Sequence, residues 1–213
     1  MKKICYVLKL TVALLVVGLL VSSAGAVEYK SVEFPEGDSS FADEVISYDL
    51  RGGATGGDPG NALSSPDNEY VALGSGGSVT LKFTNNLLIA SGDDNPDLCI
   101  FEYGSSSKEK VEVFISKDNE NWIKVGEANK KTLIDIDTVS DVNINTGYTY
   151  VRLVDMGSTR SGKSYEGADI DAVGAISSAM PAENLPESIP EFPTIAIPVL
   201  VIVGLAFVVR RNR

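Results

Sequence analysis

Residues 111–126 read VEVFISKDNENWIKVG, and this stretch decides the fold class. Apolar and polar residues alternate through its first half, so Val111, Val113 and Ile115 share one face of an extended strand. The polar residues 117–121 predict a turn, and Trp122 begins the return strand. The stretch therefore predicts an antiparallel hairpin with one buried face.

The same period of two recurs on both sides of this hairpin. SVTLKFTN (78–85) and YVRLVD (150–155) each place their apolar residues on one face. Further strand candidates are EVISYDL (44–50), EYVALG (69–74), DLCIFEYG (97–104), WIKVGE (122–127), TLIDIDT (132–138) and ADIDAVGAI (168–176). No stretch between residues 38 and 178 has a helical period. About eight or nine short strands at this spacing predict an all-β fold, a jelly-roll β-sandwich over residues 38–178.

The N-terminus has the layout of a secretory signal. Lysines come first, an apolar run follows, and small residues close the segment at Ala24 and Ala26. This layout predicts a signal peptide over residues 1–26 with cleavage after Ala26. An uncleaved anchor helix is the alternative.

The C-terminus predicts a membrane segment. Residues 194–209 are an apolar run of about 24 Å as a helix, somewhat short of a hydrocarbon core of about 30 Å. The arginines in residues 210–213 mark a basic cytoplasmic end, so the body would face outward. Residues 27–37 are a lead-in to the sandwich, and residues 179–193, with four prolines, predict a semi-extended stalk.

Charge and composition exclude several functions. Residues 27–191 carry 12 basic and 29 acidic side chains, a net charge of −17, which excludes nucleic acid as a partner. This acidity suits divalent cations or basic partners, although a well-solvated acidic exterior is the better explanation for most of these residues. The chain has no histidine, so histidine-based triads and histidine-ligated zinc are excluded. Cys99 is the single cysteine after signal removal, and its strand-like surroundings predict a buried small hydrophobe.

The tail also carries a motif. The step Pro190-Glu191-Phe192-Pro193 is followed by the short apolar segment and the basic end, and this arrangement resembles the PEF-CTERM sorting signals of archaeal surface proteins. The resemblance implies an archaeosortase-type membrane transpeptidase as a partner, which would remove the helix and transfer the body to a surface anchor. It also implies that the membrane holds the precursor through this helix until processing.

The hairpin carries a second resemblance. SKDNENW (116–122) resembles the turn of discoidin-like, galactose-binding-like sandwiches, with Asn119 in place of the usual glycine, which is tolerable because Asn adopts a left-handed conformation. YTYVRLVD (148–155) resembles a later strand of the same domains. A wider resemblance, over residues 60–177, is to bacterial and archaeal cell-surface proteins of undetermined function. It implies one sandwich on a cell surface and brings no catalytic set.

Acidic residues form the candidate metal site. Asp93, Asp94 and Asp97 lie in one polar turn, while Asp169 and Asp171 are two apart in a predicted strand, so both would project from one face. A jelly roll could bring the two segments to one end. Carboxylate oxygens from two loops suit Ca²⁺ better than Mg²⁺, which demands tighter octahedral order. The alternative is that these aspartates form turns, and this is stronger still for the further pair Asp135 and Asp137 in residues 132–138.

Aromatic residues near polar loops are candidates for sugar stacking. The glycine-rich stretch 49–70 predicts a long loop at one end of the sandwich, where binding faces often form. The candidates for stacking are Tyr70, Tyr103, Tyr148, Tyr165 and Trp122, of which Trp122 is better explained as a core or strand-pairing residue. The better exposed candidate is Tyr165, beside Arg160 and Lys163, and these three form the predicted ligand site.

These observations predict an exported, surface-anchored, non-catalytic binding or adhesion module of an archaeal cell envelope, with glycan as the expected ligand class. A structural coat component without a discrete ligand is the alternative. A carboxylate-based glycoside hydrolase is the third reading, but no motif singles out the required carboxylate pair, so the sequence does not predict an enzyme.

Overall fold

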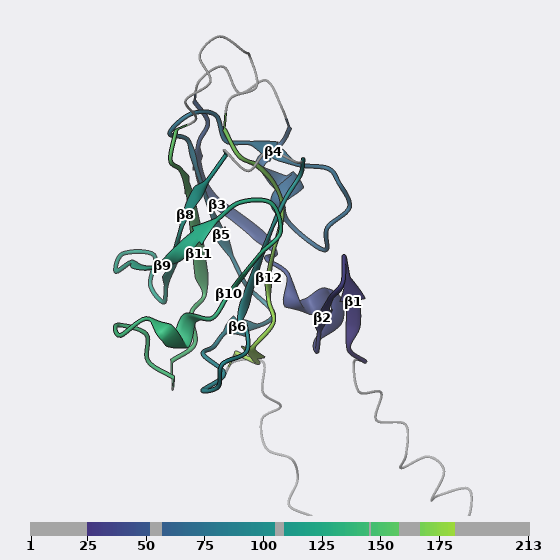
Figure 1. Ribbon diagram of the computed structural model, residues 1–213, viewed down its shortest axis with the longest axis vertical. Coiled ribbons are helices and arrows are strands. Elements are labelled where there is room, and N and C mark those ends of the chain that lie inside the picture. The colour runs from purple at the N-terminus through teal and green to yellow at the C-terminus, as the bar shows by residue number, and fades with distance from the viewer. Residues whose placement is uncertain (1–24, 52–56, 105–108, 145, 158–166, 182–213) are drawn as a thin grey trace, which may run out of the picture. The chain divides into compact units, whose positions relative to one another are not determined.

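The computed structural model describes residues 25–51, 57–104, 109–144, 146–157 and 167–181 (Figure 1). The expected signal peptide, stalk motif and membrane segment lie outside these ranges. Within them, no helix is long and apolar enough to span a membrane.

Two antiparallel sheets make up the body of the molecule (Figure 1). The five-stranded sheet has the order β3 (Glu44–Asp49), β5 (Ser78–Lys82), β11 (Tyr150–Asp155), β8 (Val111–Ser116) and β9 (Ile123–Ala128). The four-stranded sheet has the order β10 (Thr132–Ile134), β7 (Leu98–Glu102), β12 (Asp169–Ala175) and β4 (Val71–Ala72). The short pairs are β1 (Val27–Tyr29) with β2 (Val32–Phe34) and β6 (Leu87–Leu88) with β13 (Ser178–Ala179). Three 3₁₀ turns complete the described elements: η1 (Gly37–Ser40), η2 (Pro59–Ala62) and η3 (Ile136–Thr138).

The main core lies between the two sheets, as the alternating pattern predicts. Val111, Val113 and Ile115 of β8 are at most 1% exposed and belong to one buried cluster. The four-stranded sheet contributes residues such as Leu98 and Ile100 to the same cluster. The prediction of an all-β sandwich is therefore confirmed.

The turn between β8 and β9 shows why this hairpin forms. The carboxylate of Asp118 accepts backbone N–H groups of Glu120 and Asn121, at 2.9 and 2.8 Å. Asn119 has φ +62°, the left-handed conformation expected of it. Local side-chain bonds thus set the loop that fixes the register of the two strands.

Strand β7 is buried on both faces, which explains its unbroken apolar sequence. Leu98 and Ile100 face the main core, whereas Cys99 and Phe101 face away from it and pack with Phe34 and Phe41. The β1–β2 pair therefore covers the outer face of the four-stranded sheet. Burial raises the pKa of the Cys99 thiol to about 12, so this cysteine is a packing residue, as expected.

Gly174 of β12 permits this second layer to approach. A Cβ atom at this position would lie 2.6 Å from the Phe34 ring and 2.8 Å from the Phe41 ring. The absence of a side chain therefore lets both rings lie directly on the sheet.

Candidate binding sites at the two ends of the sandwich

The two groups of predicted metal ligands lie at opposite ends of β7. The antiparallel register pairs Ala175 with Leu98 at the start of β7 and Ile170 with Glu102 at its end. Leu98 and Glu102 are the two ends of this five-residue strand and lie about 14 Å apart. The expected single site of Asp93, Asp94, Asp97, Asp169 and Asp171 therefore does not form, because β7 and β12 run antiparallel.

Asp171 is already fully engaged. Its side chain is 0% exposed, one oxygen lies 2.5 Å from the Lys30 ammonium, and the other accepts the backbone N–H groups of Asp67 and Asn68 at 3.1 Å each. The ammonium supplies the positive charge that a buried carboxylate needs. A β-bulge between Ile170 and Ala172 also interrupts the regular alternation of side chains between the two faces of β12 at Asp171.

Asp169 belongs to a different acidic group, with Glu102 and Glu109. Burial raises the pKa of Glu102 from 4.5 to about 7, and the nearby charges of Glu109 and Asp169 act in the same direction. Burial, with Glu109 beside it, raises the pKa of Asp169 from 3.8 to about 6. Two half-buried carboxyls at this end therefore hold protons more readily than ordinary carboxyls do.

An aromatic pair lies at the same end. The rings of Tyr70 and Tyr103 stack with centroids 4.7 Å apart and an interplanar angle of 9°. Tyr103 is 43% exposed, and its backbone N–H donates to the carbonyl of Asp169 at 2.7 Å, which ties the ring to the start of β12. The pair joins the end of β7 to the segment before β4.

The other aromatic candidates differ from this pair. Tyr148 is 2% exposed, and its hydroxyl accepts the backbone N–H of Asn143. The guanidinium of Arg152 lies 4.1 Å from the centroid of the Trp122 ring, so that ring pairs across the sheet as expected. The predicted ligand site of Tyr165, Arg160 and Lys163 lies outside the described residues.

At the opposite end, Asp97 joins three segments of the chain. Its two carboxylate oxygens accept the backbone N–H groups of Ser91 at 2.8 Å and Ile136 at 3.0 Å. Its carbonyl accepts those of Ile176 and Ser177. Burial raises the pKa of this carboxyl, although the hydrogen bonds oppose the shift. Asp97 is therefore a structural acceptor as well as a candidate ligand.

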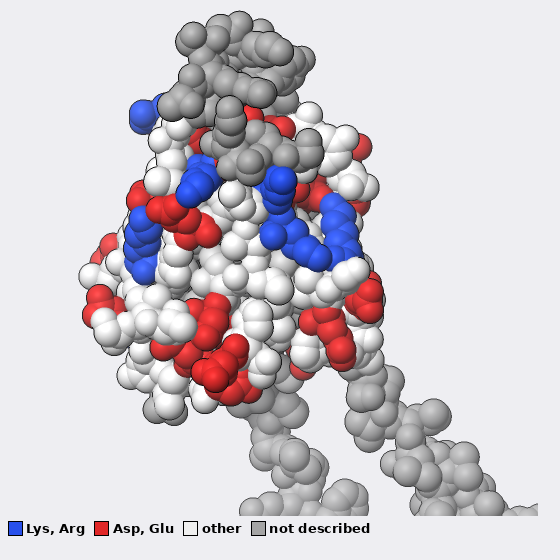
Figure 2. Space-filling view, in the orientation of Figure 1, with Lys and Arg blue, Asp and Glu red and all other residues white. Residues whose placement is uncertain are grey.

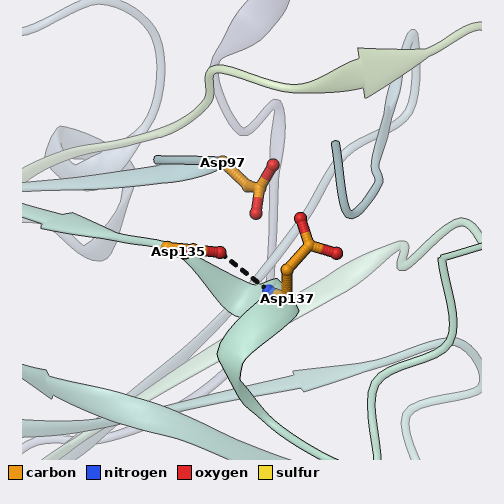
Figure 3. Close-up of side chains that lie close together, drawn as sticks. All are labelled: Asp97, Asp135 and Asp137. Atoms are coloured by element: carbon orange, nitrogen blue, oxygen red, sulfur yellow. Dashed lines mark hydrogen bonds between the residues drawn. The ribbon is translucent and has the colours of Figure 1, made fainter. Parts of the chain in front are cut away.

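Asp135 and Asp137 meet Asp97 there (Figure 3). Carboxylate oxygens of the three residues lie within 4.8 Å of one another, and Figure 3 shows the three side chains pointing toward a common space. The register that pairs Ile134 with Leu98 places Asp135 beside Asp97. Asp137 accepts the backbone N–H of Gly92, while its other oxygen is buried without a partner among the described residues. The sequence identified all three aspartates but could not show that they converge.

Asp93 and Asp94 lie in the exposed turn before Asp97. Asp93 accepts the backbone N–H of Asn95 at 2.8 Å, and this bond lowers the pKa of its carboxyl. Asp94 makes no hydrogen bond or ion pair that joins it to another described residue. Asp93 therefore acts as a turn former, the alternative that the sequence left open.

Comparison with known proteins identifies the tail. The PEF-CTERM archaeal protein sorting domain matches residues 189–213, which include the motif Pro190-Glu191-Phe192-Pro193. This domain indicates a secreted, surface-anchored protein and implies processing by an archaeosortase-type enzyme. No curated protein matches the chain.

The body is similar to several solved β-sandwich domains. One is the C-terminal domain of a chitobiase from Bacteroides fragilis, with 13% identity, 68% of this chain and 97% of that chain covered, and a TM-score of 0.43. Another is CBM32-3 from a family 31 glycoside hydrolase from Clostridium perfringens, with 14% identity, 65% and 92% coverage, and a TM-score of 0.40. A third is CpGH89CBM32-4, produced by Clostridium perfringens, in complex with glcNAc-alpha-1,4-galactose, with 11% identity, 76% and 99% coverage, and a TM-score of 0.44.

Proposed function

We propose that this chain is a non-catalytic carbohydrate-binding module displayed on an archaeal cell surface, and that it binds glycan at the Tyr103 end of the sandwich. The observation that carries the proposal is the parallel stack of the Tyr70 and Tyr103 rings, in which Tyr103 is 43% exposed. The sorting domain at residues 189–213 supports the surface location.

The chemistry of this end suits a sugar. A rigid, partly exposed aromatic ring offers a flat apolar surface for the C–H face of a pyranose, at little cost in side-chain entropy. The half-buried carboxyl of Asp169 nearby can accept hydrogen bonds from hydroxyl groups, and in its protonated form it can also donate one. An apolar plate beside a few polar groups is typical of ligand sites.

The surroundings of Glu102 favour binding over hydrolysis. A glycosidase needs two carboxyl groups that reach the scissile bond from both sides of a cleft. One oxygen of Glu102 is buried without a partner among the described residues, and the crevice between this residue, Val111 and Ala128 has no room for a water molecule. Its raised pKa therefore arises from packing against the protein, without access to a substrate.

Binding of the purified full-length chain to a glycan array tests the proposal. We expect Tyr103→Ala to weaken binding of the selected glycan about three- to tenfold, the effect of losing one aromatic contact. Tyr48→Ala is the matched control, because Tyr48 is 59% exposed on the edge strand β3. Equal loss in both variants, or no glycan binding by the parent chain, would reject the proposal and favour a coat component without a ligand.

A further inference from the structure

A pocket of about 290 Å³ opens at the Asp97 end of the sandwich, away from the tyrosine pair. It lies between the segment after β2, the turn before Asp97, and the connection from β12 to β13. Its polar lining consists of two carboxylates, three serine hydroxyls and an amide, contributed by Glu36, Asp93, Ser91, Ser177, Ser178 and Asn95. Two prolines and an isoleucine complete the wall.

Neither carboxylate in this wall forms an ion pair with a cationic side chain of the described residues. Glu36 is exposed, and its side chain makes no hydrogen bond or ion pair with any described residue. Asp93 is held in its ionised form by the backbone N–H of Asn95, which lowers the pKa of its carboxyl. No lysine or arginine is among the described residues that line the pocket. On the face that Figure 2 shows, the charged side chains of the lower part are acidic, whereas acidic and basic side chains are mixed in the middle and upper parts.

The serine hydroxyl groups that line the pocket can form further hydrogen bonds. The backbone of Ser177 is fully used, since its N–H donates to the Asp97 carbonyl and its carbonyl accepts from Ile89 at 3.1 Å. The side-chain hydroxyls of Ser177 and Ser178 make no hydrogen bond within the described part of the chain. Each hydroxyl can donate one bond and accept two.

These features suit a ligand that carries both a cationic group and hydroxyl groups. A primary ammonium donates three hydrogen bonds and accepts none, which matches a wall of carboxylate oxygens. The net charge of −17 on residues 27–191 would raise the local concentration of such a cation. We propose that the pocket binds an amino sugar, with its ammonium between Glu36 and Asp93 and its hydroxyls against Ser177 and Ser178.

This site is independent of the glycan site proposed above. Asp97 precedes β7 and Tyr103 follows it, so these two residues lie about 20 Å apart along the strand. One molecule could therefore hold an amino sugar at one end and a second sugar at the other. Tyr103→Ala should leave the affinity for the amino sugar unchanged, so the failure of one proposal is distinguishable from the failure of the other.

Calorimetric titration of the full-length chain with glucosamine tests the inference, with N-acetylglucosamine as the ligand that keeps the hydroxyls and lacks the charge. We expect millimolar binding of glucosamine and much weaker binding of N-acetylglucosamine. Glu36→Gln should weaken glucosamine binding about two- to fivefold, as expected for a solvent-exposed charge pair. Glu33→Gln removes the same charge from an exposed position of β2 outside the pocket and should have no effect.

Several results would overturn the assignment. Equal affinity for the two sugars would remove the role of the ammonium, and an unchanged affinity in Glu36→Gln would place binding elsewhere. Glucosamine binding absent at millimolar concentrations would leave no amino-sugar site. Equal affinity for Nα-acetyl-lysine amide would show that the ammonium alone is recognised, and so reject a sugar as the ligand. Loss of folding is not expected in Glu36→Gln, because the Glu36 side chain makes no hydrogen bond or ion pair with a described residue that its replacement could break.

Discussion

The Lys30 ammonium lies 2.5 Å from a carboxylate oxygen of Asp171, and this pair joins two residues that are 141 positions apart in the sequence. Lys30 and Ser31 have φ values of +46° and +64°, as expected for the two central residues of a tight turn between β1 and β2. The same ammonium also donates to the side chain of Asn68 at 3.2 Å. The contact therefore fastens the tip of the N-terminal hairpin to the four-stranded sheet.

Removal of this ammonium should destabilise the protein. Lys30→Met leaves the Asp171 carboxylate buried with two backbone N–H donors and no cation, so we expect a loss of about 1–3 kcal/mol in the free energy of unfolding. Denaturant unfolding of the purified chain measures this loss. Lys117→Met is the control, because Lys117 is exposed in the β8–β9 turn.

A double variant separates charge from packing. Lys30→Met combined with Asp171→Asn removes both charges and retains an oxygen for the two backbone donors, so it should recover part of the lost stability. If the double variant is as unstable as the sum of the two single variants, the ion pair does not stabilise the hairpin.

Stability should also depend on pH through Glu102. Its pKa is raised from 4.5 to about 7 in the folded chain, so between these values the folded state binds more protons than the unfolded state. This group therefore contributes stability below about pH 4.5, and the contribution is lost as the pH rises through about 7. Asp169, with a pKa raised to about 6, acts in the same direction.

Denaturant midpoints measured across this pH window test the effect. Glu102→Gln should flatten the decline and raise stability at its alkaline end, because the amide cannot ionise. Glu33→Gln on the exposed face of β2 should keep the slope of the parent chain. A decline that is equally steep in Glu102→Gln would assign the pH dependence to other groups.

The sequence predicted the strands of the main core because a strand with one buried face has apolar residues at every second position. Val113 and Leu153 are both 0% exposed for this reason. The second aromatic layer left no such pattern, since β1 and β2 are three residues each. The sequence therefore did not predict that Phe34 packs on β7. It predicted residues 27–37 only as a lead-in.

The candidate sites were harder to predict because they depend on register between distant strands. The sequence placed Asp97 in a polar turn and Asp137 in a strand candidate over residues 132–138, but their proximity follows from the pairing of β10 with β7. The position of Asp169 also depends on strand pairing. Because β12 runs antiparallel to β7, Asp169 lies at the end of β7 opposite to Asp97. Residue type can be recognised locally, whereas the convergence of carboxylates is a property of the whole sheet.

Processing of the chain at both ends is a prediction of the sequence that mass spectrometry can check. The surface-bound protein should begin near Val27 and lack the residues after about Phe192, because the signal peptide and the sorting helix are removed. The first described strand begins at Val27, so cleavage after Ala26 would leave the fold intact. A surface-bound form that still contains Arg213 would show an ordinary membrane anchor and contradict removal of the tail.

Calcium binding also stays a prediction, and the structure directs it to Asp97, Asp135 and Asp137. Three carboxylates within 4.8 Å repel one another when ionised, and a divalent cation would reverse the sign of that interaction. Calcium at about 100 times its Kd should stabilise the full chain by about 2.7 kcal/mol, seen as a higher melting temperature. Sodium at matched ionic strength should stabilise the chain much less, because it screens the charges without being coordinated by the three carboxylates.

Two variants test the site. Asp137→Asn should abolish the calcium shift in melting temperature. Asp94→Asn, an equal charge change in the neighbouring exposed turn, should retain it. A calcium shift lost in Asp169→Asn would instead place the ion at the opposite end, and equal shifts with calcium and sodium would leave these aspartates as turn formers alone.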